Sequence, residues 1–208
     1  MHSAVMRVWQ GWLVLAGRSR RSFYDWRDGM GLTGRLCLMF AAAAGIGLCS
    51  RVAIPLPFTP VPLSLQTFGV AAAAVTMGRG WGGASAAAYV AGIALGVPWT
   101  VSGVGGPAVF SGPTAGYLLG FVLEGAALSL FAANPSRCRW LSMWGAILVC
   151  DVVFVLTPGT LWIWGWYEAA GQPVTLMDAA AKGFFPFIAV DIAKAGLAAA
   201  VVGWLGRR

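Results

Sequence analysis

Apolar residues fill most of this chain in long runs, and short segments rich in glycine, proline or arginine separate the runs. A transmembrane helix needs about 20 predominantly apolar residues, and most of the runs approach that length. The six runs are 35–54, 65–77, 81–96, 114–133, 140–162 and 186–205. The pattern therefore predicts an all-α polytopic membrane protein, with six transmembrane helices in a single bundle.

Prolines refine the boundaries of the last two spans. Residues 178–205 are too many for one crossing, but Pro186 suits the first turn of a new helix and disfavours helix at the residue before it. We therefore expect 178–185 to lie at the membrane interface and the sixth span to begin at Pro186. Pro158 and Gly159 are expected to bend the end of the fifth span.

Two uncharged loops connect the spans on one side. Residues 55–62 contain four prolines, which forbid a continuous helix, and residues 97–113 are rich in glycine and proline. Both loops are apolar or small throughout, unlike linkers exposed to water. Because irregular backbone near membrane depth is tolerated where it packs on protein or lines a cavity, these loops are expected to cover a cavity.

Composition and charge support this interpretation. Charged residues make up 10% of the chain, against about 25% in soluble domains. The net charge is +7, but the arginines lie at the ends of apolar runs and therefore indicate topology rather than nucleic-acid binding. The Lys/Arg bias predicts a multi-pass membrane protein with both termini cytoplasmic and the two loops outside.

Residues 1–34 differ from the rest. They carry five arginines, and their apolar part is too short to span a bilayer. We expect a basic cytoplasmic or interfacial N-terminal extension, with a start near Met30 as the alternative, followed by a membrane domain over 35–208.

Asp191 and Lys194 interrupt the last apolar run. Ionisable groups at membrane depth are costly and usually face a partner or a cavity. Their spacing of three residues places them on one helix face, in the outer half of the sixth span. Two interpretations stay open: a site facing a cavity beneath the loops, or a salt bridge that satisfies itself. For Glu124 and Asp151, packing or a hydrogen bond inside the bundle is favoured.

The sequence gives no indication of catalysis or metal binding. The four cysteines form no CxxC pair, and His2 is the only histidine, so we expect no metal, no cofactor and no enzyme activity. The first span carries two pairs of small residues, Ala41 with Gly45 and Ala43 with Gly47. Such spacing lets another helix approach closely, either within the bundle or from a partner protein.

Several segments together resemble the BioY family, the biotin-binding S component of energy-coupling-factor (ECF) transporters. The resemblance covers about residues 35–205. It rests on Ile54–Thr67 (IPLPFTPVPLSLQT), Ser102–Gly106 (SGVGG), Gly112–Gly120 (GPTAGYLLG), Pro186–Phe187 and Asp191–Lys194 (DIAK).

The resemblance implies a protein of a prokaryotic cell (inner or plasma) membrane that captures biotin from outside with high affinity. It also implies docking on a transmembrane coupling protein driven by a cytoplasmic ATPase pair. The chain has no GxxxxGK[ST] motif, so it cannot power transport itself, and docking through Ala41, Ala43, Gly45 and Gly47 gains weight. The implied substrate-binding residues are Asp191, Lys194, Gln66, Thr67, Tyr89, Trp99, Gly103, Gly105 and Tyr117. The alternative function is a stand-alone proton-coupled carrier of small molecules, with Asp151, Glu124 and the Asp191–Lys194 pair as a relay.

Overall fold

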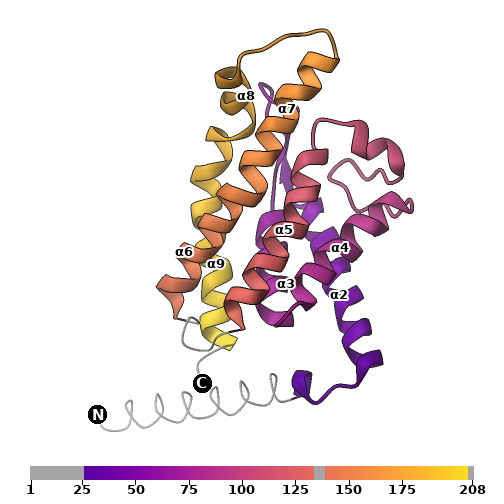
Figure 1. Ribbon diagram of the computed structural model, residues 1–208, viewed down its shortest axis with the longest axis vertical. Helices are drawn as coiled ribbons and strands as arrows, with labels where there is room; N and C mark the ends of the chain where they lie inside the picture. The colour runs from indigo at the N-terminus through magenta and orange to yellow at the C-terminus, as the bar shows by residue number, and fades with distance from the viewer. Residues whose placement is uncertain (1–25, 134–138, 206–208) are drawn as a thin grey trace, which may run out of the picture.

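The computed structural model describes residues 26–133 and 139–205, so most of the predicted extension over 1–34 lies outside the described residues. The described part is almost entirely helical (Figure 1). Its elements are α2 (Leu32–Arg51), β1 (Ala53–Ile54), β2 (Leu63–Ser64), α3 (Gln66–Met77), α4 (Trp81–Ala94), η1 (Pro107–Ser111), α5 (Ala115–Ala132), α6 (Trp140–Cys150), η3 (Asp151–Leu156), α7 (Thr157–Ala169), α8 (Leu176–Gly183) and α9 (Phe185–Leu205).

The predicted fold class is confirmed, because the helices follow the apolar runs. Four helical stretches are long and apolar enough to cross a membrane: Leu32–Arg51, Ala115–Ala132, Trp140–Ala169 and Leu176–Val201. The runs predicted as the second and third spans also form helices, but α3 has only 12 residues and α4 only 14. The count of six spans and the cytoplasmic location of both termini stay predictions.

The short helix α3 lies in the middle of the bundle and contacts α2, α4, α5 and α9 (Figure 1). At 1.5 Å per residue it covers only about 18 Å, well short of the ~30 Å hydrocarbon core. Its first residue, Gln66, therefore lies within the bundle rather than at its end. The space that a longer α3 would fill is covered by loops.

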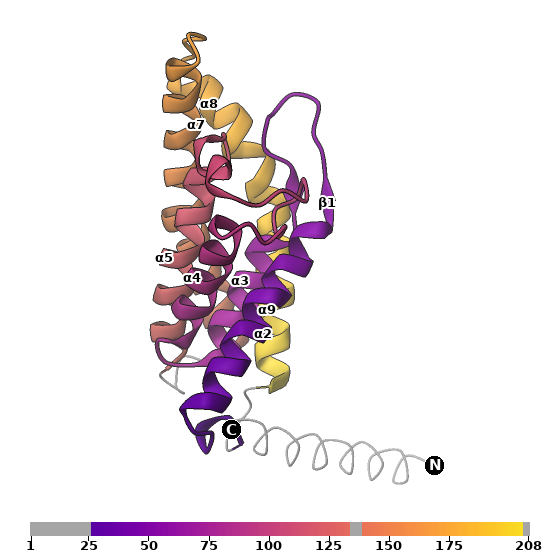
Figure 2. The ribbon, with the colours of Figure 1, turned by 90° about the vertical axis from the view of Figure 1, so that its right-hand side faces the viewer.

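Those loops define one end of the molecule, called here the loop end. The proline loop, 55–62, connects β1 to β2, which pair antiparallel with Ala53 opposite Ser64 (Figure 2). The glycine loop, 97–113, contains only the short 3₁₀ helix η1. Indole groups hold this loop in place, since Trp162 donates to the carbonyl oxygen of Gly112 at 2.9 Å and Trp166 to that of Ser111 at 3.1 Å.

The fifth predicted span differs from expectation near Pro158. Helix continues from Trp140 to Ala169, beyond the predicted end at residue 162. The departure from α geometry occurs before the proline, in the π-helical turn η3. Proline lacks an N–H and cannot close the α-helical bond to the turn before it. The wider π turn absorbs this defect, and the Thr157 hydroxyl donates to the Val152 carbonyl oxygen at 2.7 Å.

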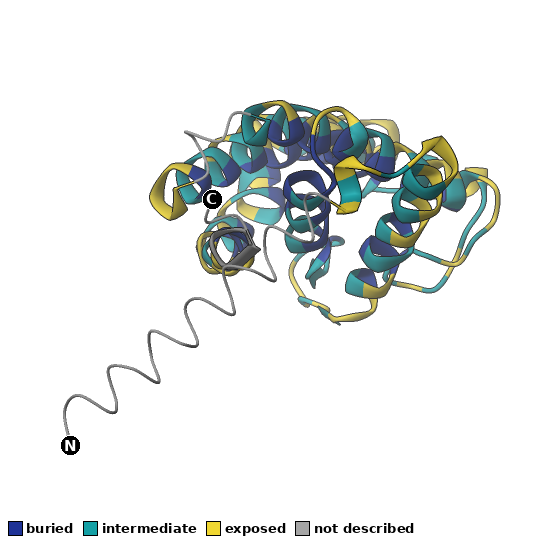
Figure 3. Cartoon of the chain, turned by 90° about the horizontal axis from the view of Figure 1, so that it is seen from below, coloured by how far each residue is buried: buried dark blue, intermediate teal, exposed yellow. Residues whose placement is uncertain are grey.

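The break between α8 and α9 lies close to its predicted position. A capping box begins α8, in which Thr175 and Asp178 exchange hydrogen bonds between side chain and backbone. The helix ends at Gly183, and α9 begins at Phe185, one residue before Pro186. Viewed from below, the buried residues lie where helices face each other and exposed residues lie around the rim (Figure 3). Many exposed side chains are large and apolar, as expected of a surface that faces lipid.

Close helix packing yields a stability prediction. A Cβ atom on Gly82 of α4 would approach the Cβ of Ser129 on α5 to 2.9 Å. We expect Gly82→Ala to lower the thermal unfolding midpoint of the protein in detergent, since overpacking costs about 1–3 kcal/mol. Gly145→Ala is the matched control, because a Cβ there meets no atom within 4 Å. The same Cβ would collide with the Cα of Ala74 on α3, so equal midpoints for the two variants would contradict the packing of α4 against α3 and α5.

Candidate functional site

A cavity of about 570 Å³ lies at the loop end, beneath the two loops. Volumes of this size are typical of small-molecule sites. Its walls are largely apolar, and its polar lining includes Thr59, Ser64, Gln66, Thr67, Thr100, Ser102, Thr114, Tyr117, Asp191 and Lys194. The cavity therefore matches the prediction that the loops cover a hollow in the bundle.

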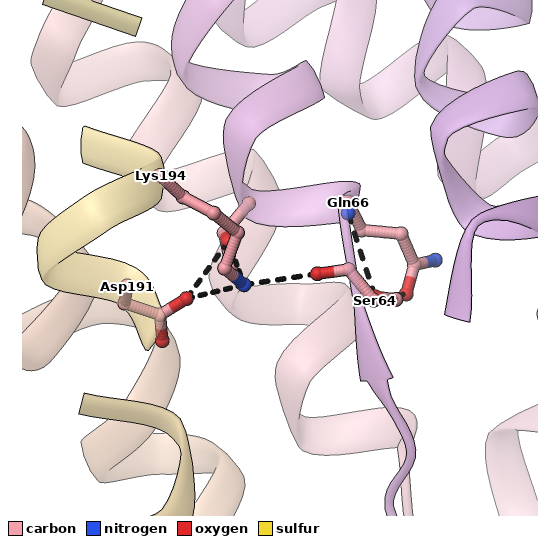
Figure 4. A network of polar contacts seen from close by, with 5 residues as sticks. Ser64, Gln66, Asp191 and Lys194 are labelled. Carbon is pink, nitrogen blue, oxygen red and sulfur yellow. Dashed lines mark hydrogen bonds and ion pairs between the residues drawn. The ribbon is translucent and has the colours of Figure 1, made fainter. Parts of the chain in front are cut away.

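Lys194 lies at the centre of a hydrogen-bond network at one wall of the cavity (Figure 4). Its ammonium group donates to the carbonyl oxygen of Ser64 at 2.9 Å and to the hydroxyl of Thr67 at 2.9 Å, and it forms an ion pair with Asp191. The Thr67 hydroxyl in turn donates to Asp191 Oδ1 at 3.1 Å. All three ammonium N–H groups thus have an acceptor, although the side chain is only 6% exposed.

Local sequence explains this geometry. The three-residue spacing on α9 turns Asp191 and Lys194 toward the first turn of α3, which packs against α9. Small residues on the same helix, Ala195, Ala198 and Ala199, are fully buried or nearly so and let the neighbouring helices approach. Both interpretations are therefore correct in part: Asp191 and Lys194 line the cavity, and they also form a salt bridge with each other.

Gln66 begins a second chain of contacts. It accepts a hydrogen bond from the Ser64 hydroxyl at 2.8 Å and donates to the Tyr89 hydroxyl at 2.5 Å. Tyr89 donates to the carbonyl oxygen of Trp99 at 3.0 Å, and the two rings stack with centroids 6.1 Å apart. Gln66 and Thr67 line the cavity, whereas Tyr89 and Trp99 do not. Tyr89 and Trp99 instead hold the Gln66 side chain in place from outside the cavity lining.

Of the remaining predicted residues, only Tyr117 lines the cavity. Its hydroxyl donates to the carbonyl oxygen of Gly183 at 2.7 Å, which ties α5 to the end of α8. Gly103 and Gly105 lie outside the lining and shape the glycine loop instead. Gly103 has φ +75°, and a Cβ on Gly105 would meet the carbonyl oxygen of Gly96 at 2.5 Å, so both positions suit glycine.

Sequence reasoning missed several polar lining residues in the loops. Ser64 supplies a carbonyl to Lys194 and a hydroxyl to Gln66. Thr59 donates to the carbonyl oxygen of Lys182 at 2.7 Å and so fastens the proline loop to α8. In the sequence, these residues could have been recognised as serine and threonine within loops that carry no charge.

The two pairs of small residues on α2 face different directions. Ala43 and Gly47 are buried within the chain, and a Cβ on Gly47 would meet the Trp99 ring at 2.6 Å. Ala41 is exposed, and a Cβ on Gly45 would meet no atom within 4 Å. Only Ala41 and Gly45 are therefore open to a partner helix.

The buried ion pair yields a second stability prediction. Removing one partner leaves an uncompensated buried charge, which costs about 3–5 kcal/mol, whereas replacing both by apolar residues is often neutral. We expect Asp191→Leu and Lys194→Met each to lower the thermal unfolding midpoint without ligand, and the double variant to recover most of the loss. A double variant that loses the sum of both effects would contradict a direct pair.

Known proteins of the BioY family are similar to this chain in sequence. The model of the BioY family matches residues 20–208, beginning before the predicted domain boundary at residue 35. A probable biotin transporter BioY from Methanothermobacter thermautotrophicus is 36% identical over 61% of this chain and 82% of its own length. A biotin transporter BioY from Thermotoga maritima is 31% identical over 71% of this chain and 82% of its own length.

A solved structure of a biotin-transport component has a fold similar to that of this chain. The crystal structure of the S-component for biotin from an ECF-type ABC transporter superposes with a TM-score of 0.73 and 26% identity, over 84% of this chain and 93% of that chain. These relatives are transporters, so the prediction that the chain is not an enzyme is confirmed. The resemblance drawn from the sequence motifs is confirmed as well: the chain belongs to the BioY family.

Proposed function

We propose that the chain captures biotin from outside the cell in the loop-end cavity and delivers it as the S component of an ECF-type transporter. The observation that carries this proposal is the buried Asp191–Lys194 pair in the wall of a largely apolar cavity of about 570 Å³. The family membership and the name of the structural neighbour support biotin as the substrate.

The chemistry of biotin suits such a cavity. Biotin has an apolar bicycle and tail, a ureido group that donates and accepts hydrogen bonds, and a carboxylate. Apolar walls made by Phe121, Val155 and Phe187 match the bicycle and tail, while Asp191 can accept from ureido N–H groups. The first two residues of α3, Gln66 and Thr67, line the cavity, and the positive end of a helix dipole favours negative charge there.

Energy for transport has to come from partner proteins. The chain has no phosphate-binding motif for ATP, and the structural neighbour is named as a component of an ABC transporter. The Ala41–Gly45 stripe, which leaves room for a close helix contact, is the proposed docking face for the transmembrane coupling protein. With the arginine-rich ends cytoplasmic, the loop end faces outward and the cavity is filled from outside.

Biotin binding by the purified protein tests the proposal. Asp191→Asn and Lys194→Met are each expected to weaken binding more than about tenfold, because truncating one partner of a buried hydrogen-bonded charge pair costs about 2–5 kcal/mol. Glu168→Gln is the matched control, since Glu168 is exposed on α7. Isothermal titration calorimetry measures the affinities, and wild-type affinity in both site variants would rule out this site.

Uptake measurements separate docking from binding. Ala41→Leu combined with Gly45→Leu is expected to reduce biotin uptake by cells to background while leaving biotin binding intact, since larger side chains block close helix approach. Gly145→Leu, at another open glycine, serves as the control. Uptake at wild-type rates by the double variant would show that the docking face lies elsewhere on the protein.

Reconstitution of the chain alone distinguishes the alternative function. Two buried acids, Glu124 with neither carboxyl oxygen partnered and Asp151 with one oxygen unpartnered, give a proton-coupled carrier a structural basis. A subunit is expected to bind biotin in liposomes without accumulating it. Accumulation driven by a proton gradient alone would favour the carrier.

A further inference from the structure

Glu124 and Asp151 lie directly beneath the cavity. Phe121 on α5 and Val155 on η3 line it. Glu124 follows Phe121 by three residues and Asp151 precedes Val155 by four, and such spacings keep residues on one helix face. The two helices run in opposite directions, so both acids lie about one turn farther from the loop end than the lining residues.

A tight contact brings the two acids together. A Cβ atom on Gly120 would collide with the carbonyl oxygen of Phe154, so the backbones of α5 and η3 touch there. The π-helical turn begins at Asp151, and π turns often occur at functional positions. Backbone contact and an irregular turn thus fix the backbone positions of the two acids relative to each other.

Both acids are buried without adequate partners. Glu124 is 0% exposed and neither of its carboxyl oxygens has a hydrogen-bond partner, and Asp151 is 2% exposed with one oxygen unpartnered, among the residues described. Burying an ionised carboxylate without donors costs far more than burying the neutral acid. Burial without donors therefore favours the form of Glu124 that carries a proton.

The surrounding charges belong to the cavity wall. Within the described part of the chain, the groups that interact electrostatically with Glu124 are Asp151, Asp191 and Lys194, and the Cys150 thiol interacts with both buried acids. The Asp191 carboxyl group lies near that of Asp151 as well, and two ionised carboxylates at close range repel each other, so a proton on one of them is favoured.

We propose that Glu124 and Asp151 form a proton-binding site beneath the cavity, and that the cavity binds its anionic ligand together with a proton held at this site. The inference rests on the proposed function, because biotin supplies the anion. The charge of the Lys194 ammonium is already balanced by Asp191, so a ligand carboxylate adds net negative charge to the site. A proton on the buried acids removes that charge.

The direction of the pH effect follows from this coupling. Ionising Glu124 adds negative charge beneath the cavity that holds the ligand's carboxylate. Affinity for biotin is therefore constant at acidic pH and falls as rising pH removes the proton. One linked proton limits the fall to about tenfold per pH unit.

The experiment compares proton exchange with binding in the full-length protein. Calorimetry in two buffers of different ionisation enthalpy, from mildly acidic to mildly alkaline pH, gives both biotin affinity and the number of protons bound. Glu124→Gln, which mimics the neutral acid, is expected to keep the acidic-pH affinity and flatten the pH dependence. Asp151→Asn provides a second variant if Glu124→Gln does not fold, and Glu168→Gln is the control that keeps the wild-type profile.

The outcomes separate this inference from the proposed function. If the wild-type protein does not bind biotin, the proposed function fails. If it binds biotin with no proton exchanged at any pH tested, or if the pH dependence persists in both Glu124→Gln and Asp151→Asn, the proton site is wrong and the proposed function stands. Infrared difference spectra on biotin binding add a direct readout: the carbonyl band of a protonated carboxyl group should change in the wild type and be lost in Glu124→Gln.

Discussion

The arrangement of the loop end depends on which acceptors bind the buried ammonium group of Lys194. Lys194 is 5% exposed as a residue, and an ammonium group buried in a membrane protein must use its three donors. Two acceptors lie where β2 leads into α3, the Ser64 carbonyl oxygen and the Thr67 hydroxyl, and the third, Asp191, lies on the same helix as Lys194. These bonds fix the level at which α3 begins relative to α9. Because α3 begins inside the bundle, a cavity remains above it.

Loops occupy the space that helices leave free, and hydrogen bonds between the loops and helices α7 and α8 hold them there. The proline loop is fastened through Thr59 to the end of α8, and the glycine loop is held by two indoles of α7. Irregular backbone within a membrane protein needs such internal partners, since lipid offers none. The roof of the cavity is therefore built from α7 and α8 as much as from the loops themselves.

Much of this architecture could be predicted from the sequence, because apolar runs and helix breakers are local signals. The helices, the charged pair on one face and the irregular loops all follow from them. The π-helical turn over Asp151–Leu156 could not be predicted, since it lies before Pro158 and not at it. Nor could the positions of Tyr89 and Trp99, which support Gln66 from behind rather than line the cavity, because they depend on contacts between distant segments. The same holds for the rotation of α2, which buries Ala43 and Gly47.

Charge balance links the cavity to the core beneath it. Glu124, Asp151 and Asp191 are three buried carboxyl groups around the single ammonium of Lys194, and full ionisation would leave a net negative charge in a medium of low dielectric constant. Desolvation makes that state too costly, so protons must supply the balance that side chains do not. A ligand that brings its own carboxylate into the same field changes the balance again. Any anion that enters this cavity therefore acts on the protons below it, even without touching the acids that hold them.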